Sequence, residues 1–356
     1  MLSYQLISWI SILSCLSTFV MPLKKMNSRL PIVSILVPIY NVESYIERCA
    51  RSLFEQTYPN LEFVFVDDAS PDKSIEILQQ VIKDYPKWNK YISIIHHDKN
   101  YGIASTRNTL LDNCNGEFLI HVDSDDWIEP KAVDLLVKRQ LETNADVVTG
   151  SYILHTINEG IEKTRKWIVP NQDRLETLKD MLKVGSYVAT WNRLIRCSLY
   201  RNNNIRWVEG IDAGEDKIIT PRLIYCSRKV ATCDTITYHY NRNNTNSYVN
   251  KLPHSLNIQL QLIRSCQLNV EYFCDKEAFL YEATNQELVE RLKKMLELNF
   301  KNGYRQGYNA MLAMLDGIDL KYWPLIGWDR PKKRWLDHHY YLKLMRNKLR
   351  QLIKRY

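Results

Sequence analysis

The sequence predicts an α/β fold in which a parallel sheet begins at about Pro31. Short apolar runs rich in β-branched residues alternate with segments whose apolar residues recur at helical spacing, a pattern typical of βαβ units. Two of the apolar runs end in clustered aspartates. Ligands of open parallel sheets bind at the carboxyl ends of the strands, so these aspartates indicate a candidate nucleotide-binding site.

Each expected element follows from a local pattern. The first strand is a β-branched run that ends at Pro38, and the later strands are apolar enough to be buried on both faces. Asn115-Gly116, after the third helix, is a common helix stop. The expected order is strand 32–37, helix 44–54, strand 61–66, helix 72–85, strand 92–95, helix 102–114 and strand 118–122. After 146–151 the alternation weakens, and residues 251–316 are mostly of helical period.

Composition excludes several classes of protein. Of 356 residues, 45% are hydrophobic and 25% charged, as in ordinary globular chains, and a mean hydropathy of -0.35 excludes a polytopic membrane protein. Residues 329–356 hold ten Lys and Arg and two Asp, so this tail carries the whole net charge of +8. A nucleic-acid enzyme would spread basic charge over a binding face, so no nucleic-acid partner is expected. The eight cysteines form no CxxC pair, which predicts reduced thiols of a cytosolic protein.

The N-terminal segment has two interpretations. Residues 2–23 carry no charge and are long enough to span a bilayer, although their Ser, Thr and Gln content makes a poor span. A signal peptide is not expected, because no basic region precedes the apolar stretch. The alternative is that translation begins at Met26. If the segment is an anchor, Lys24, Lys25 and Arg29 place the following domain in the cytoplasm.

The acidic strand ends predict a single crevice. With strand order 3-2-1-4, Asp68, the pair Pro38 and Tyr40, and the pair Asp123 and Asp125 would lie side by side. Carboxylates that crowd together need a cation or hydrogen-bond donors, and a ribose with a metal–diphosphate complex supplies both. An isolated DxD sequence is more often a plain turn. Two acidic strand ends in one chain, each after a buried strand, favour a binding site over plain turns.

Several ordered motifs resemble family 2 glycosyltransferases with the GT-A fold, over about residues 31–248. They are VSILVPIYN at 33–41, SLFEQTYPNL at 52–61, VDDAS at 66–70, NYG at 100–102, TRN at 106–108 and VDSDDW at 122–127. The resemblance implies an inverting, metal-dependent transferase that uses a nucleotide sugar, most often a UDP-sugar, with Mn²⁺ or Mg²⁺. Ala69 and Pro71 stand where the family usually has glycine and threonine.

The resemblance also implies roles for the residues of the crevice. Asp125 would bind the metal, and Asp123 would contact the ribose or the metal-bound phosphate. For Arg107 and Asn100 the alternatives are a helix-surface charge and a loop cap. The implied nucleotide-sugar-binding residues are Pro38, Tyr40, Asp68, Asn100, Arg107 and Asp123.

A second acidic pair completes the implied active site. Glu215 and Asp216 precede an apolar helical pattern, and acidic residues at a helix start also simply complement the helix dipole. The family places its general base at the position of Asp216. Such a group is needed because the attacking sugar hydroxyl must lose its proton.

The resemblance implies three residues on the acceptor side of the site. They are Glu215, Trp191 and His239. Trp191 could pack against a sugar, although a tryptophan at such a position is more often part of the core. His239 lies in a segment that resembles a closing loop, where Asn241 replaces the usual arginine and Arg242 follows. His239 could be a third metal ligand or, more simply, a surface histidine.

The leading hypothesis is a bacterial-type glycosyltransferase that builds a surface polysaccharide or glycolipid at the inner face of the cell membrane, from a nucleotide-sugar donor and a glycan or lipid-linked acceptor. The alternatives are a sugar-1-phosphate nucleotidyltransferase, which needs a Gly-rich loop that this chain lacks, and a scaffold without turnover. The expected parts are the apolar segment 1–30, the GT-A domain 31–250 and a helical region 251–356. In its tail, the apolar residues of 342–356 fall on one face of an expected helix and the basic residues on the other. This pattern predicts a helix that binds anionic membranes or packs on the protein's own surface.

Overall fold

The computed structural model describes residues 30–158, 161–170, 173–183, 187–244, 252, 255–315 and 322. The chain divides at residue 31, and all of the elements below lie within residues 32–356. The predictions for residues 2–23 and for the basic tail lie outside the described residues. None of the helices that the structure does describe combines the length and the hydrophobicity needed to cross a membrane.

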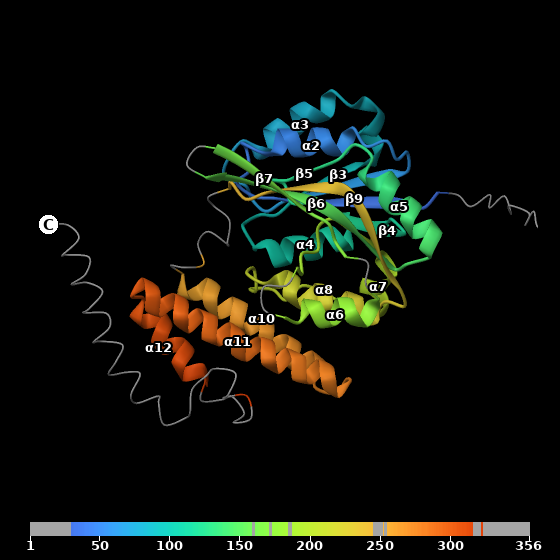
Figure 1. The fold of residues 1–356 in the computed structure, drawn as a ribbon. Coiled ribbons are helices and arrows are strands. Elements are labelled where there is room, and N and C mark those ends of the chain that lie inside the picture. Colours follow the sequence, from blue (N-terminus) through green and yellow to red (C-terminus); the bar gives the residue numbers. More distant parts are fainter. Residues whose placement is uncertain are drawn as a thin grey trace, which may run out of the picture. The chain divides into compact units, whose positions relative to one another are not determined.

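The parallel half of the sheet is confirmed. Its strands are β1 (Val33–Ile39), β2 (Leu61–Asp67), β3 (Ile92–His96) and β4 (Phe118–His121), in the order β3-β2-β1-β4. Every residue of β1 is buried, because parallel strands are covered on both faces. Figure 1 shows α2 (Ile46–Phe54) and α3 (Ser74–Lys83) on one face and α4 (Ile103–Asp112) on the other. The short 3₁₀ helix η1 (Pro86–Tyr91) leads into β3.

The second half of the sheet is mixed. β8 (Arg193–Arg196) is antiparallel to β4 and to β6 (Val147–Asn158), and β9 (Val230–Asn241) is parallel to β6. β5 (Trp127–Ile128) is antiparallel to β9, and β7 (Ile161–Trp167) to β6. The helices here are α5 (Ala132–Thr143), α6 (Arg174–Met181), α7 (Cys197–Asn202) and α8 (Glu215–Cys226).

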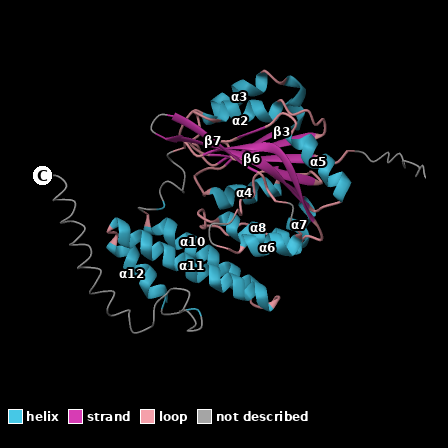
Figure 2. Cartoon of the chain, viewed as in Figure 1, coloured by secondary structure: helices cyan, strands magenta, loops and turns pink. Residues whose placement is uncertain are grey.

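The described residues between 256 and 314 are mostly helical, as the sequence predicts. They form α10 (Leu256–Phe273), α11 (Ala278–Asn302) and α12 (Arg305–Met314), seen as the helices farthest from the sheet in Figure 2. The Ser255 hydroxyl accepts a hydrogen bond from the Ile258 amide and begins α10, while Gly303 ends α11 in the left-handed conformation. A boundary at residue 250 stays a prediction. The cysteines within the described residues form no disulfide, and their redox state stays a prediction.

The start of α8 is held by the helical region. The Gln261 side-chain oxygen accepts hydrogen bonds from the backbone amides of Asp212 and Ala213, at 2.9 and 3.0 Å. Gly214 has a φ of 85°, and a Cβ there would lie 2.8 Å from side-chain atoms of α10, so only glycine fits. The Lys217 ammonium, on the first turn of α8, pairs with Glu287 of α11 where both side chains are buried. The acidic pair 215–216 is thus fixed by residues far along the chain.

Replacing Glu287 with glutamine is expected to lower the free energy of unfolding by about 3–5 kcal/mol, because the buried Lys217 ammonium loses its counter-ion. Urea unfolding at neutral pH measures this loss. The matched control is Glu271→Gln, which breaks an exposed pair with Arg264 and should cost less than about 1 kcal/mol. Equal losses in the two variants would contradict the importance of the buried pair.

Candidate active site

The register of the parallel strands brings the predicted residues to one edge. Ile39 of β1 lies opposite Asp67 of β2, and the Asp68 amide donates to the Ile39 carbonyl at 2.9 Å. Pro38 is buried within β1, whereas the Tyr40 side chain just beyond the strand is 46% exposed. An exposed aromatic ring at this edge is free to contact a flat ligand.

Asp68 organises the neighbouring loop. Its carboxylate accepts hydrogen bonds from the backbone amides of Tyr101 and Gly102, both at 2.9 Å, and lies 2.7 Å from His97 Nδ1. Gly102 has a φ of 90°, and a Cβ there would clash with the Asp212 carboxylate. These contacts fix the loop that carries Asn100, whose side chain is exposed. His97 lies in none of the motifs of the sequence, because its partner Asp68 is 29 residues away.

Arg107 of α4 connects the two acidic groups. Its side chain is buried, so the alternative of a helix-surface charge is wrong. One guanidinium nitrogen donates to Asp123 Oδ1 at 3.0 Å, and the other donates to the Thr190 hydroxyl at 2.7 Å. Arg107 also lies 3.7 Å from both Glu215 and Asp216. The aspartate at the end of β4 and the acidic pair at the start of α8 therefore form one cluster.

The two members of the acidic pair differ in their surroundings. Asp216 accepts hydrogen bonds from the Thr190 hydroxyl at 2.7 Å and from the Thr190 backbone amide at 3.2 Å. Burial, together with the nearby charge of Asp216, raises the pKa of Glu215 to about 8, against the lowering effect of Arg107. Glu215 is thus protonated at neutral pH, and Asp216 is the member placed to accept a proton.

The DxD segment is anchored by β9 and by Asn244, which follows it. Asp125 Oδ2 accepts a hydrogen bond from the side-chain amide of Asn244 at 2.9 Å. Burial raises the pKa of Asp125. Asp126 is fully buried. Its carboxylate accepts hydrogen bonds from the Tyr238 hydroxyl at 2.6 Å and from the backbone amide of Asn241 at 2.7 Å. The sequence did not distinguish this structural aspartate from its neighbours. Asn241 stands where the usual arginine would be, and its side-chain amide donates to the Asp125 carbonyl at 3.2 Å.

The donor set fits a metal that arrives with a diphosphate. Within the described part of the chain, no group of three or more His, Cys, Asp or Glu side chains is arranged to hold a metal by itself. Mg²⁺ and Mn²⁺ commonly take one or two carboxylates and complete their shells with phosphate oxygens and water. Burial raises the pKa of Asp123 to about 6, so Asp123 is ionised at neutral pH. Asp125 and Asp123 can supply such carboxylates.

The remaining predicted residues lie in aromatic surroundings. Trp191 is buried and stacks on Tyr238, with ring centroids 4.5 Å apart, so its position is that of a core residue. His239 stacks on Trp127 and lies 2.8 Å from the Glu129 carboxylate. Its side chain is only 12% exposed, so the interpretation as a surface histidine is wrong.

Solved structures establish the fold. S. aureus TarS, in a structure titled as its complex with UDP-GlcNAc, aligns with a TM-score of 0.61 and 21% identity over 87% of this chain and 89% of that one. The mannosyltransferase PcManGT from Pyrobaculum calidifontis, titled as a complex with GDP-Man and Mn²⁺, aligns with a TM-score of 0.54 and 16% identity over 88% and 85%. The predicted GT-A fold, with acidic strand ends and a helical C-terminal region, is confirmed.

Residues 34–203 match the family model described as glycosyl transferase family 2. The glycosyltransferase GlyA of Streptococcus pneumoniae is 28% identical over 77% of this chain and 38% of its own length. The poly(ribitol-phosphate) beta-glucosyltransferase of Bacillus spizizenii is 30% identical over 58% of this chain and 32% of its own. Residues 34–203 are thus similar to glycosyl transferase family 2 over somewhat less than half of the chain, and the chain spans about a third of the length of these two relatives. Asp216 lies beyond the matched residues.

Proposed function

We propose that the chain is an inverting glycosyltransferase. It moves a sugar from a nucleotide sugar, proposed to be a UDP-sugar, to a hydroxyl of a glycan or lipid-linked acceptor in surface polysaccharide synthesis. The observation that carries the proposal is the Arg107 bridge, which joins Asp123 of the donor edge to Asp216 of the second acidic pair. The complex of TarS with UDP-GlcNAc supports the donor class, and the poly(ribitol-phosphate) beta-glucosyltransferase of Bacillus spizizenii supports the acceptor class.

In this proposal, each part of the site has a separate task. Tyr40 and the edge formed by Pro38 and Asp68 hold the base and ribose, and Asp125 holds the divalent metal. When bound, Mn²⁺ or Mg²⁺ offsets the negative charge of the departing diphosphate. Asp216 takes the proton of the acceptor hydroxyl while the hydroxyl oxygen bonds to the anomeric carbon and the bond to the diphosphate breaks.

Arg107 is a positioning residue in this scheme. Its contacts with Asp123 and Thr190 set the separation between the donor edge and Asp216, and its charge offsets part of the negative charge of the cluster. Because Glu215 is protonated below about pH 8, it does not compete with Asp216 for the proton. The proposed base thus faces the donor from a fixed position.

The test is a screen of nucleotide sugars for transfer or hydrolysis with Mn²⁺ or Mg²⁺, with and without membrane extract. Metal-dependent release of UDP from one donor is the expected result. Failure of every donor would favour the scaffold without turnover. Release of pyrophosphate from a nucleoside triphosphate and a sugar 1-phosphate would favour the nucleotidyltransferase.

We further propose that the enzyme works at the inner face of the cell membrane, held there by the basic tail. The chain 26–356 is expected to co-sediment with anionic vesicles, and a shortened chain ending at Trp328 to bind much less, because each basic residue near the lipid contributes about 1 kcal/mol. Raising the salt concentration should release the longer chain. Equal binding of both chains, or binding insensitive to salt, would rule out the tail as an electrostatic anchor.

A further inference from the structure

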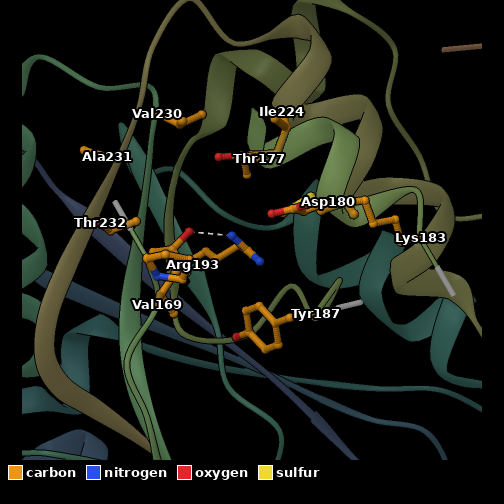
Figure 3. A pocket seen from close by; sticks show the side chains of 13 residues that line it. Val169, Thr177, Asp180, Lys183, Tyr187, Arg193, Ile224, Val230, Ala231 and Thr232 are labelled. Atoms are coloured by element: carbon orange, nitrogen blue, oxygen red, sulfur yellow. Dashed lines mark hydrogen bonds and ion pairs between the residues drawn. The ribbon is translucent and has the colours of Figure 1, made fainter. Parts of the chain in front are cut away.

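A cavity of about 400 Å³ lies apart from the acidic cluster, between the sheet and the helices α6 and α8. Its apolar wall includes Ile224 of α8 and Val230 of β9. Threonine side chains of β6, α6 and β9 add hydroxyl groups to the lining. Figure 3 shows the side chain of Arg193 extending into the space that these residues enclose. The cavity is large enough for a molecule the size of a monosaccharide.

Among the described residues, no carboxylate forms an ion pair with the buried Arg193 guanidinium, and the charge of Asp216 only partly offsets the effect of its burial. The Arg193 side chain is 2% exposed. The Nε atom donates to the Ala189 carbonyl at 2.8 Å, one terminal nitrogen donates to the Thr149 hydroxyl, and the Tyr187 ring lies 5.0 Å from the guanidinium. The other terminal nitrogen, Nη2, has no hydrogen-bond partner within the described residues. None of these contacts supplies a negative charge.

The rest of the cavity does not neutralise Arg193. Asp180 and Lys183 both line it, but they pair with each other at 2.5 Å, so their charges offset. Removing a guanidinium from water without an opposite charge is costly, and burial lowers the pKa of Arg193 accordingly. A guanidinium also offers a planar fork that matches a carboxylate or a phosphate. What the cavity lacks is therefore an anion.

We propose that this cavity binds the anionic group of a sugar-sized ligand, with a carboxylate or phosphate on Arg193 Nη2 and the ring against Ile224 and Val230. The site is separate from the donor crevice, and it does not rest on the proposed transferase activity. Two adjacent residues connect the two sites. The Ala189 carbonyl accepts a hydrogen bond from Arg193, and the Thr190 hydroxyl donates one to Asp216. A ligand here would thus bear on the backbone that holds Asp216.

Calorimetry of the full chain with glucuronate, glucose and inorganic phosphate tests the proposal. Glucuronate is expected to bind about 10- to 100-fold more tightly than glucose, the range that charged hydrogen bonds contribute. Phosphate binding as tight as glucuronate binding would also support the site and would show that the anion alone suffices. Equal binding of glucuronate and glucose would overturn the proposal. So would displacement of glucuronate by UDP with Mn²⁺, because the two sites would then be one.

The variants Arg193→Met and Thr149→Val assign the binding to this cavity. Arg193→Met is expected to abolish the preference for glucuronate and to leave the affinity for UDP with Mn²⁺ within about twofold, and its thermal unfolding shows whether it is folded. Thr149→Val removes only the hydroxyl that holds the guanidinium, so a smaller loss is expected. Unchanged glucuronate affinity in a folded Arg193→Met, or in Thr149→Val if the first variant does not fold, would refute the assignment.

Discussion

Replacing Asp216 with asparagine is expected to leave donor binding intact and to lower turnover by about 10²–10⁴-fold, the usual contribution of a general base. Asparagine has nearly the same shape, and its side-chain oxygen can still accept a hydrogen bond from the Thr190 hydroxyl. It cannot take the proton of an acceptor hydroxyl. Steady-state transfer assays measure the loss of turnover, and calorimetry with UDP and Mn²⁺ checks that the donor site is unchanged.

Glu215→Gln is the matched control for this prediction. The pKa of about 8 means that Glu215 is already neutral at pH 7, so a neutral glutamine should preserve most of the turnover. If instead Asp216→Asn kept wild-type turnover and Glu215→Gln lost it, the base would have to be assigned to Glu215. Measuring both variants at pH 7 therefore separates the two carboxylates.

Asp125→Ala is expected to abolish metal-dependent donor binding, because its carboxylate is proposed as the protein's direct bond to the cation. Calorimetric titration of UDP in the presence of Mn²⁺ measures the effect. The matched control is Asn244→Ala, which removes the amide that orients Asp125 but leaves the carboxylate, so a much smaller loss is expected. Unchanged UDP affinity in Asp125→Ala would sink the assignment of Asp125 to the metal.

The parallel half of the fold was predictable because its signals are local. A short β-branched run predicts a buried strand, and the aspartates Asp68 and Asp123 follow such runs closely. The order β3-β2-β1-β4 then follows from the fold class. The second half was less predictable, since β6 and β9 pair across more than 80 residues and carry a bulge near Ser151. No local pattern encodes such a register.

The roles of individual side chains in the site were harder to predict than their positions. The position of Arg107 within its helix does not reveal from the sequence whether its side chain faces solvent. Only the folded chain shows that it is buried against Asp123. Asp126 differs from Asp125 by one position, yet its oxygens are engaged by β9. His239 likewise depends on Glu129, which lies 110 residues away. Such distinctions come from tertiary contacts between distant segments, which a single sequence does not display.

The contacts that hold the start of α8 have a consequence for how function varies with sequence. Gln261 and Glu287 reach no acidic residue of the cluster, yet they fix the backbone from Asp212 to Lys217 in which Asp216 lies. A small shift of this backbone would change the angle at which an acceptor hydroxyl meets its base, and misplacement on the order of 1 Å is costly in such reactions. Substitutions in α10 and α11 should therefore produce kinetic defects that resemble those of active-site variants. Differences in acceptor preference between homologues are expected to depend on α10 and α11 as well as on the acidic cluster.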